Sequence, residues 1–165
     1  MASLSLVIYA LSISSAAAQK FAYLSYDSVF TSMPDYAIAT ENYEKIRVQY
    51  DAEGKRVEQD FNSKYEEFLD GMRDFPQSIL QKRQSELQEL MEKNIAFKEE
   101  SRKLLKKAKD EIFAPLHQKL HNTLHLIGVE RGYAFIINTD NNSTPFINPA
   151  LGDDITDEVK ARIAK

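Results

Sequence analysis

Apolar side chains recur at steps of three and four residues along most of this chain. This spacing is a heptad pattern, and it predicts a helix whose apolar seam packs against a second helix. The first helix is expected over about 35–74, which would make it about 60 Å long at 1.5 Å per residue. Glu53 and Gly54 interrupt its seam. The seam positions are Tyr36, Ala39, Tyr43, Ile46, Tyr50, Val57, Phe61, Tyr65, Phe68, Met72 and Phe75.

A second seam begins after Gly71 and Pro76, which are strong helix breakers between two long periodic stretches. Pro76 suits a first helical position, because its missing N–H needs no partner there. The second helix is therefore expected from Pro76 to about Ile127, with a kink or interruption at Pro115. Its seam positions are Leu80, Leu87, Leu90, Asn94, Phe97, Ser101, Leu104, Ala108 and Ile112.

The short break between the two helices brings their seams together if the chain folds back on itself. The expected contacts have residue numbers that sum to about 151: Ile46–Leu104, Tyr43–Ala108, Phe61–Leu90, Val57–Asn94 and Gly54–Phe97. A constant sum means one continuous antiparallel register. Residues 35–115 are therefore predicted to form a two-helix coiled-coil arm with its tip near 71–78.

The two ends of the chain predict short strands and a final helix. Aromatic residues are dense over 21–26, and 133–148 contains two β-rich runs around a turn, which predicts a strand and a hairpin. The last residues predict a helix with Thr156 as its N-cap. Three short strands make a poor sheet alone, so we expect residues 19–34 and 116–165 to form a small β body that other copies complete. The expected oligomer contacts are Phe21, Tyr23, Phe135, Ile136 and Ile137.

The predicted fold class is α+β, with a long helical arm on a small β body and a C-terminal helix. The composition agrees, because 28% charged residues, no Trp and five Gly among 165 residues suit a helical chain. The net charge of −4 is mild and does not favour binding to nucleic acid. The absence of Cys excludes a disulfide scaffold, a thiolate metal site and a Cys-linked lipid anchor.

The first residues carry an export pattern. An apolar run over 4–13 precedes three consecutive alanines that end at Ala18, as in a cleavable signal peptide over 1–18. The run is too short for a transmembrane helix, which needs ~20 apolar residues. No Lys or Arg precedes the run. We expect cleavage after Ala18 and an exported, soluble mature chain that begins at Gln19.

The sequence contains no pattern that indicates catalysis. It has no Gly-rich phosphate loop, no G-x-S-x-G and no H-E-x-x-H, so we predict no catalytic residues and no cofactor. His117, His121 and His125 are spaced at i, i+4 and i+8, which is a candidate metal or pH-sensing set. They lie beside the stripe of Leu116, Leu120 and Leu124, so the favoured interpretation is a polar flank of a core helix.

Two surfaces of the arm are candidates for binding. The first is apolar, and we expect Phe75 and Ile79 to be its most open members, although coiled-coil packing would also explain such residues. It comprises Phe68, Met72, Phe75, Ile79 and Leu80. The second is a basic stripe that could bind acidic segments, although nearby acids favour a solvated helix face. It comprises Arg102, Lys103, Lys106, Lys107 and Lys109.

Three stretches and the arm between them resemble the Skp/OmpH family of periplasmic chaperones. The stretches are FAYLSYDSVFTSMPDY, FAPLHQKLHNTLHLIGVERGYAFIINTD and DDITDEV, in that order along the whole mature chain. The resemblance implies a trimer with a β-barrel body and three helical tentacles around a cavity, which holds unfolded outer-membrane proteins without ATP. The chain departs from the family over residues 60–90, where acids outnumber bases, although family members have basic tips.

These observations together predict an ATP-independent holdase in the periplasm that binds unfolded outer-membrane proteins. A homotrimer is the expected assembly, with no nucleic-acid partner. Transient contact with a membrane surface is a further candidate interaction. The acidic tip argues against one route to it, which is attraction of the tip to anionic lipid. The alternative is a structural coiled-coil protein of the envelope whose arm binds one defined partner.

Overall fold

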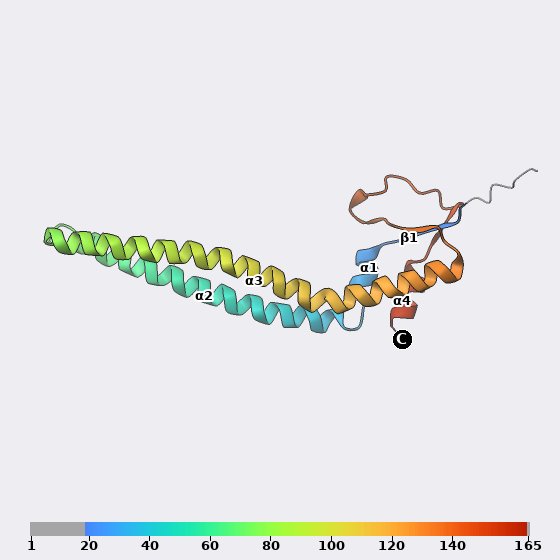
Figure 1. The fold of residues 1–165 in the computed structure, drawn as a ribbon, viewed down its shortest axis with the longest axis horizontal. Coiled ribbons are helices and arrows are strands. Elements are labelled where there is room, and N and C mark those ends of the chain that lie inside the picture. The colour runs from blue at the N-terminus through green and yellow to red at the C-terminus, as the bar shows by residue number, and fades with distance from the viewer. Residues whose placement is uncertain (1–18, 165) are drawn as a thin grey trace, which may run out of the picture.

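The computed structural model describes residues 19–164 and has a small α+β body that carries a long helical arm (Figure 1). The predicted signal peptide over 1–18 lies outside the described residues. The arm is formed by α2 (Tyr36–Gly71) and α3 (Gln77–Arg131), and α3 also continues into the body. The other elements of the body are β1 (Phe21–Leu24), α1 (Tyr26–Thr31), β2 (Phe135–Asn138), a 3-10 turn (Asp140–Asn142), β3 (Gly152–Asp154) and α4 (Thr156–Ile163).

The arm has the antiparallel register that the seams predict. A Cβ added at Gly54 would lie 3.6 Å from Cε1 of Phe97, so these two residues face each other as expected. Three seam positions were wrong, and Met72, which is 43% exposed, is the first. Leu104 is 37% exposed, and Leu105 is half-buried in its place. The reason is that the spacing from Phe97 through Ser101 continues in steps of four. Tyr65 is 45% exposed and lies on the flank of the arm.

Pro115 lies inside α3 and does not end it. The axis of α3 changes direction where the arm meets the body (Figure 1). Proline removes one backbone hydrogen bond, which leaves the carbonyl of Glu111 without its helical partner. Both residues are exposed, so water can satisfy that carbonyl. The helix therefore bends and does not break.

The sheet has the strand order β2-β1-β3, and both pairs of strands are parallel. The predicted hairpin over 133–148 is wrong. The second β-rich run, around Phe146 and Ile147, forms no strand, and the third strand is Gly152–Asp154. Asn141 and Asn142 both have positive φ and turn the chain away from β2. The N-terminal strand β1 lies between β2 and β3, so the two later strands do not pair with each other as a hairpin would.

Helix α1 replaces the end of the strand predicted over 21–26. The hydroxyl of Ser25 accepts a hydrogen bond from the backbone N–H of Ser28 at 3.2 Å, which caps this helix. The Asp140 carboxylate accepts from the Ser25 hydroxyl at 2.8 Å and from the N–H of Asp27 at 2.7 Å. The segment after β2 therefore fixes the start of α1. Long-range bonds of this kind carry no local sequence signal.

The C-terminal helix forms as predicted, but its cap differs. Thr156 is the first helical residue, and Ile155 occupies the N-cap position. The Asp154 carboxylate accepts from the backbone N–H of Thr156 at 2.9 Å and from its hydroxyl at 2.6 Å. A carboxylate at the N-terminal end of a helix also interacts favourably with the helix dipole.

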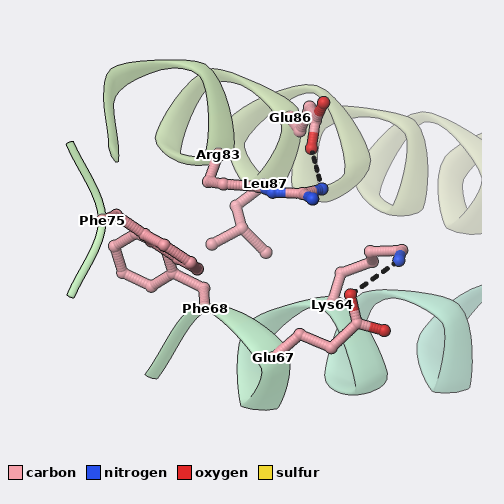
Figure 2. A pocket seen from close by; sticks show the side chains of 7 residues that line it. All are labelled: Lys64, Glu67, Phe68, Phe75, Arg83, Glu86 and Leu87. Atoms are coloured by element: carbon pink, nitrogen blue, oxygen red, sulfur yellow. Dashed lines mark hydrogen bonds and ion pairs between the residues drawn. The ribbon is translucent and has the colours of Figure 1, made fainter. Parts of the chain in front are cut away.

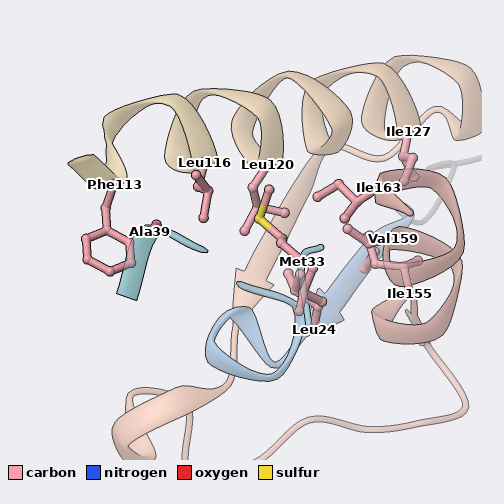
Figure 3. Packing of buried hydrophobic residues seen from close by; sticks show 12 residues of the cluster. Leu24, Met33, Ala39, Phe113, Leu116, Leu120, Ile127, Ile155, Val159 and Ile163 are labelled. Atoms are coloured by element: carbon pink, nitrogen blue, oxygen red, sulfur yellow. The ribbon is translucent and has the colours of Figure 1, made fainter. Parts of the chain in front are cut away.

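The hydrophobic core lies in the body, between the inner face of the sheet and helices α1, α3 and α4 (Figure 3). Along the arm, no residue between Ala39 and Phe113 is fully buried. The arm is therefore held by one seam, whereas the body has a closed core. The buried residues are Ala22, Leu24, Val29, Met33, Ala39, Phe113, Leu116, Leu120, Ile127, Ile155, Val159 and Ile163.

Candidate functional site

The tip of the arm is closed by an aromatic side chain. The ring of Phe75 lies against Gly71, so close that an added Cβ on Gly71 would overlap it. Figure 2 shows the Phe75 ring beside Phe68 and facing Leu87 of α3. Gly71 is therefore needed for a close approach at the tip. Phe75 fills the space between the end of α2 and the start of α3 (Figure 2).

The apolar residues predicted at the tip divide into two groups. Met72 and Ile79 are 43% and 41% exposed, as a binding surface requires. Phe68, Phe75 and Leu80 are half-buried. The expectation that Phe75 is among the most open residues is wrong, because Gly71 leaves room for its ring to pack.

Further exposed apolar side chains extend along one flank of the arm. Tyr65, Leu69 and Met72 are spaced at i, i+4 and i+7 and therefore share one face of α2. Met91 and Ile95 share a face of α3 by the same spacing. They are 45%, 47%, 43%, 48% and 54% exposed, respectively. We call these five residues the apolar flank.

A groove of about 480 Å³ lies halfway along the arm. We call it the mid-arm groove. Met91, Ile95, Lys98 and Arg102 follow each other at helical spacing, and the last two line the groove, so it continues the apolar flank toward the body. Its lining residues are Tyr50, Asp51, Gly54, Lys55, Glu58, Phe97, Lys98, Ser101, Arg102 and Leu105.

The opposite flank of the arm is charged. Lys64 and Glu67 form an ion pair at 2.7 Å, and Arg83 and Glu86 form another at 2.8 Å (Figure 2). The hydrogen bond from Lys64 lowers the pKa of the Glu67 carboxyl below its usual value. Glu89 and Lys93 extend this surface along α3. The arm thus has one apolar and one charged flank, which the two seams alone do not predict.

The apolar flank has a sequence pattern of its own, which lies directly beside the seam positions. Tyr65 follows Phe61 by four residues, which predicts a seam position. Its ring instead stacks on Phe61 with centroids 6.0 Å apart and stays outside the seam. Leu69, Met91 and Ile95 lie one residue after a seam position, and their helical spacing could have marked a second stripe.

The predicted basic stripe divides between paired and unpaired side chains. Lys106 pairs with Asp110, and Lys107 lies 3.7 Å from Glu111. Within residues 19–164, no ion pair involves Lys103 or Lys109, and Arg102 lines the mid-arm groove. All five side chains are exposed. The stripe is a solvated helix surface whose Arg102 end meets the mid-arm groove.

The three histidines have different surroundings. Nδ1 of His117 lies 2.8 Å from the Tyr26 hydroxyl, and its ring stacks on Phe30 at 4.3 Å. His121 and His125 line a groove beside Tyr133 and Phe135. Within the part of the chain that the structure describes, no group of three or more His, Asp or Glu residues is placed to hold a metal ion.

The predicted oligomer contacts lie on two faces of the sheet. Phe21, Tyr23, Phe135 and Ile137 are on the outer face, because the register pairs Phe21 with Phe135 and Tyr23 with Ile137. Ile136 points to the inner face, where it packs against the core and Gly128. The rings of Phe21 and Phe135 stack with centroids 5.6 Å apart, and Phe135 is 50% exposed. The outer face of the sheet is thus apolar and partly open.

Among the described helices, none is both long enough and apolar enough to cross a lipid bilayer. The structure defines a class of protein in which a thin helical arm, with one apolar and one charged flank, projects from a small α+β body. The arm exposes apolar side chains on one side, and the body exposes an apolar sheet face.

Comparison with known proteins agrees with this class. The family described as outer membrane protein (OmpH-like) matches residues 20–163, so this chain belongs to the OmpH-like family. Comparison with curated proteins gave no match. A crystal structure of a candidate outer membrane chaperone (OmpH-like) from Caulobacter crescentus CB15 has the same fold, with a TM-score of 0.66 and 14% identity. The alignment covers 88% of this chain and 84% of that one.

Proposed function

We propose that this protein is an ATP-independent holdase that binds unfolded outer-membrane proteins in the periplasm and prevents their aggregation. The observation that carries the proposal is the apolar flank. Apolar side chains gathered on one side of a surface commonly mark an interaction site, whereas scattered ones do not. A two-helix arm has no third element to cover them, so they remain available to an unfolded chain.

We further propose that three copies assemble through the outer faces of their sheets. The residues at this interface are Phe21, Tyr23, Phe135 and Ile137, whereas Ile136 belongs to the core. Three arms would then surround a cavity, with residues 35–115 as the arm and 19–34 with 116–165 as the body. Many weak contacts from several arms would hold a client by avidity, without any tight single contact.

Export is part of the proposal. A signal peptide over 1–18 would be removed after Ala18, which would place Gln19 at the mature N-terminus. Mass spectrometry of the protein purified from the periplasm tests this step. A mass that includes residues 1–18 would contradict it.

The experiment for the holdase is light scattering of a denatured membrane β-barrel protein diluted from urea. Wild type should suppress the scattering without ATP. Leu69→Ser with Met91→Ser removes two members of the apolar flank and should weaken suppression at every salt concentration, because salt does not weaken apolar contacts. Lys64→Gln with Glu67→Gln is the matched control, since it leaves the net charge unchanged on the opposite flank.

The basic stripe gives a second, separable contribution. A variant with Lys103 and Lys109 changed to Gln should slow capture of the client at low salt only, because exposed charges are screened beyond ~8 Å at physiological ionic strength. Full suppression in the flank and stripe variants at all salt concentrations would remove the arm from client binding. That outcome would favour a structural envelope protein whose arm binds one defined partner.

A further inference from the structure

The mid-arm groove exists because one side chain is missing from the arm. Gly54 stands where a seam residue would cover Phe97, and the nearest atom to an added Cβ is Cε1 of Phe97 at 3.6 Å. That distance is an ordinary van der Waals contact, so the helix does not need glycine here for packing. The result is an open groove over two aromatic side chains, Tyr50 and Phe97.

The rim of the groove has excess positive charge. Lys55 contributes one side and Lys98 and Arg102 the other, and the ion pairs of the arm in residues 19–164 use other cations. The two acids on the rim differ. Asp51 is already paired with Arg47 at 2.7 Å, which leaves Glu58 as the rim acid that forms no described ion pair.

The floor of the groove combines apolar and polar groups. Tyr50, Phe97 and Leu105 are half-buried and form the apolar part. The hydroxyl of Ser101 is buried and has no hydrogen-bond partner among the described residues. Because that hydroxyl is closed to solvent, the surface that a ligand can contact is the apolar part of the floor.

We propose that the mid-arm groove is a docking site for an extended polypeptide segment in which an aromatic residue lies next to an acidic one. The aromatic ring packs on Tyr50 and Phe97, and the carboxylate binds Arg102 and the two lysines. Aromatic rings pack favourably in offset or edge-on contact, and guanidinium binds carboxylate through two parallel hydrogen bonds. This inference rests on the proposed holdase function, and it assigns a sequence preference to one part of the arm.

The position of the groove supports a polypeptide as the occupant. One heptad separates Glu58 from Tyr65, and Lys98 from Met91, so the groove and the apolar flank lie in line along the same side of the arm. A chain that lies on the flank can therefore reach the groove without changing direction. An extended chain also carries an amide at every residue, which suits a rim with both acids and bases.

The test uses the purified protein and three fluorescent peptides of equal length. The first contains Phe-Asp pairs, the second has Asn in place of Asp, and the third has Ser in place of Phe. Fluorescence anisotropy at low salt should show the first peptide binding roughly two- to fivefold tighter than the second for each carboxylate bound, as exposed ion pairs allow. The difference should shrink as salt is raised.

Variants of the groove locate the binding. Gly54→Leu places a side chain in the groove and should weaken binding of the Phe-Asp peptide roughly tenfold, by displacing its aromatic contact. Gly54→Ala is the matched control and should bind like wild type. Lys98→Gln should weaken the preference for Asp over Asn, because Lys55 and Arg102 remain on the rim. Lys93→Gln, which removes the same charge from the charged flank of α3, should retain that preference. Circular dichroism verifies that each variant keeps its helix content.

Three results would overturn the proposal. The first is unchanged peptide binding in Gly54→Leu. The second is an equal effect of Lys93→Gln and Lys98→Gln, which would mean unspecific attraction to a cationic arm. The third is binding of anionic phospholipid vesicles, but not of peptides, that Gly54→Leu abolishes. Aggregation assays on the same variants keep the two proposals apart, because Gly54→Leu can lose the peptide while the apolar flank still suppresses aggregation.

Discussion

In the body, strands and helices from both ends of the chain enclose one core, whereas along the arm each helix contacts only one neighbour. Leu120 and Ile163 are almost fully buried by residues far away in sequence. Leu90 and Phe97 are half-buried by a single facing helix. The comparison shows why the two parts can have different tasks. Apolar residues of the body are buried and stabilise the fold, whereas several apolar residues of the arm remain exposed.

The largest expected effect is the loss of a core side chain in the body. Leu120→Ala should lower the free energy of unfolding by about 2–5 kcal/mol, because it leaves a cavity in a closed core. Leu90→Ala in the arm should cost about 1 kcal/mol, since a half-buried side chain loses less contact and water can fill the space. Urea unfolding followed by circular dichroism measures both. Equal losses would show that arm and body do not differ in packing.

The two faces of the sheet give the next comparison. Ile136→Asp places a carboxylate against the core and should destabilise the body by about 2–4 kcal/mol. Phe135→Asp changes an exposed residue on the outer face, so the fold should remain while the proposed trimer dissociates. Sedimentation velocity and thermal unfolding separate these outcomes. A folded Phe135→Asp protein that sediments like wild type would exclude this face as the subunit interface.

A smaller effect is expected within the arm. Gly54→Ala should stabilise the arm by about 1 kcal/mol, because glycine is that much less favourable than alanine in a helix and the added methyl contacts Phe97 without overlap. Amide hydrogen exchange at residues 52–56 should become slower, and it should be faster in wild type than at Ile46 or Phe61. Destabilisation by this substitution would mean that Phe97 occupies the space more tightly than the structure indicates.

The smallest effect concerns alkaline pH in the body. Burial, followed by the hydrogen bond to Asp153, raises the pKa of Tyr133 to about 12. The folded state therefore holds this proton more tightly than the unfolded state. The contribution to stability is complete below about pH 10 and is lost as pH rises through about 12. Wild type should lose stability relative to Tyr133→Phe across this interval in thermal unfolding at stepped pH. Parallel curves for the two proteins would show that Tyr133 does not titrate with unfolding.

The arm was predictable because its determinants are local. The heptad spacing, Gly71 and Pro76 specify two helices and a turn, and one register places Gly54 beside Phe97. The sheet was less predictable, because parallel strands pair with partners more than a hundred residues away. The β-rich run around Phe146 satisfies local strand preferences but has no strand to pair with. The binding residues at the tip were predicted in part, since local spacing cannot tell that Phe75 covers Gly71.

The sequence by itself determined the helical arm, its length and register, and the resemblance to a family, because periodic apolar residues and helix breakers act within a few turns of the chain. Only the tertiary structure decided which side chains stay exposed. Exposure depends on what the facing helix and the sheet cover, and it places Tyr65, Leu69 and Met91 on one flank and the charged pairs on the other. It also decided that β1 is central in a parallel sheet, because strand pairing depends on distant segments that no local pattern describes.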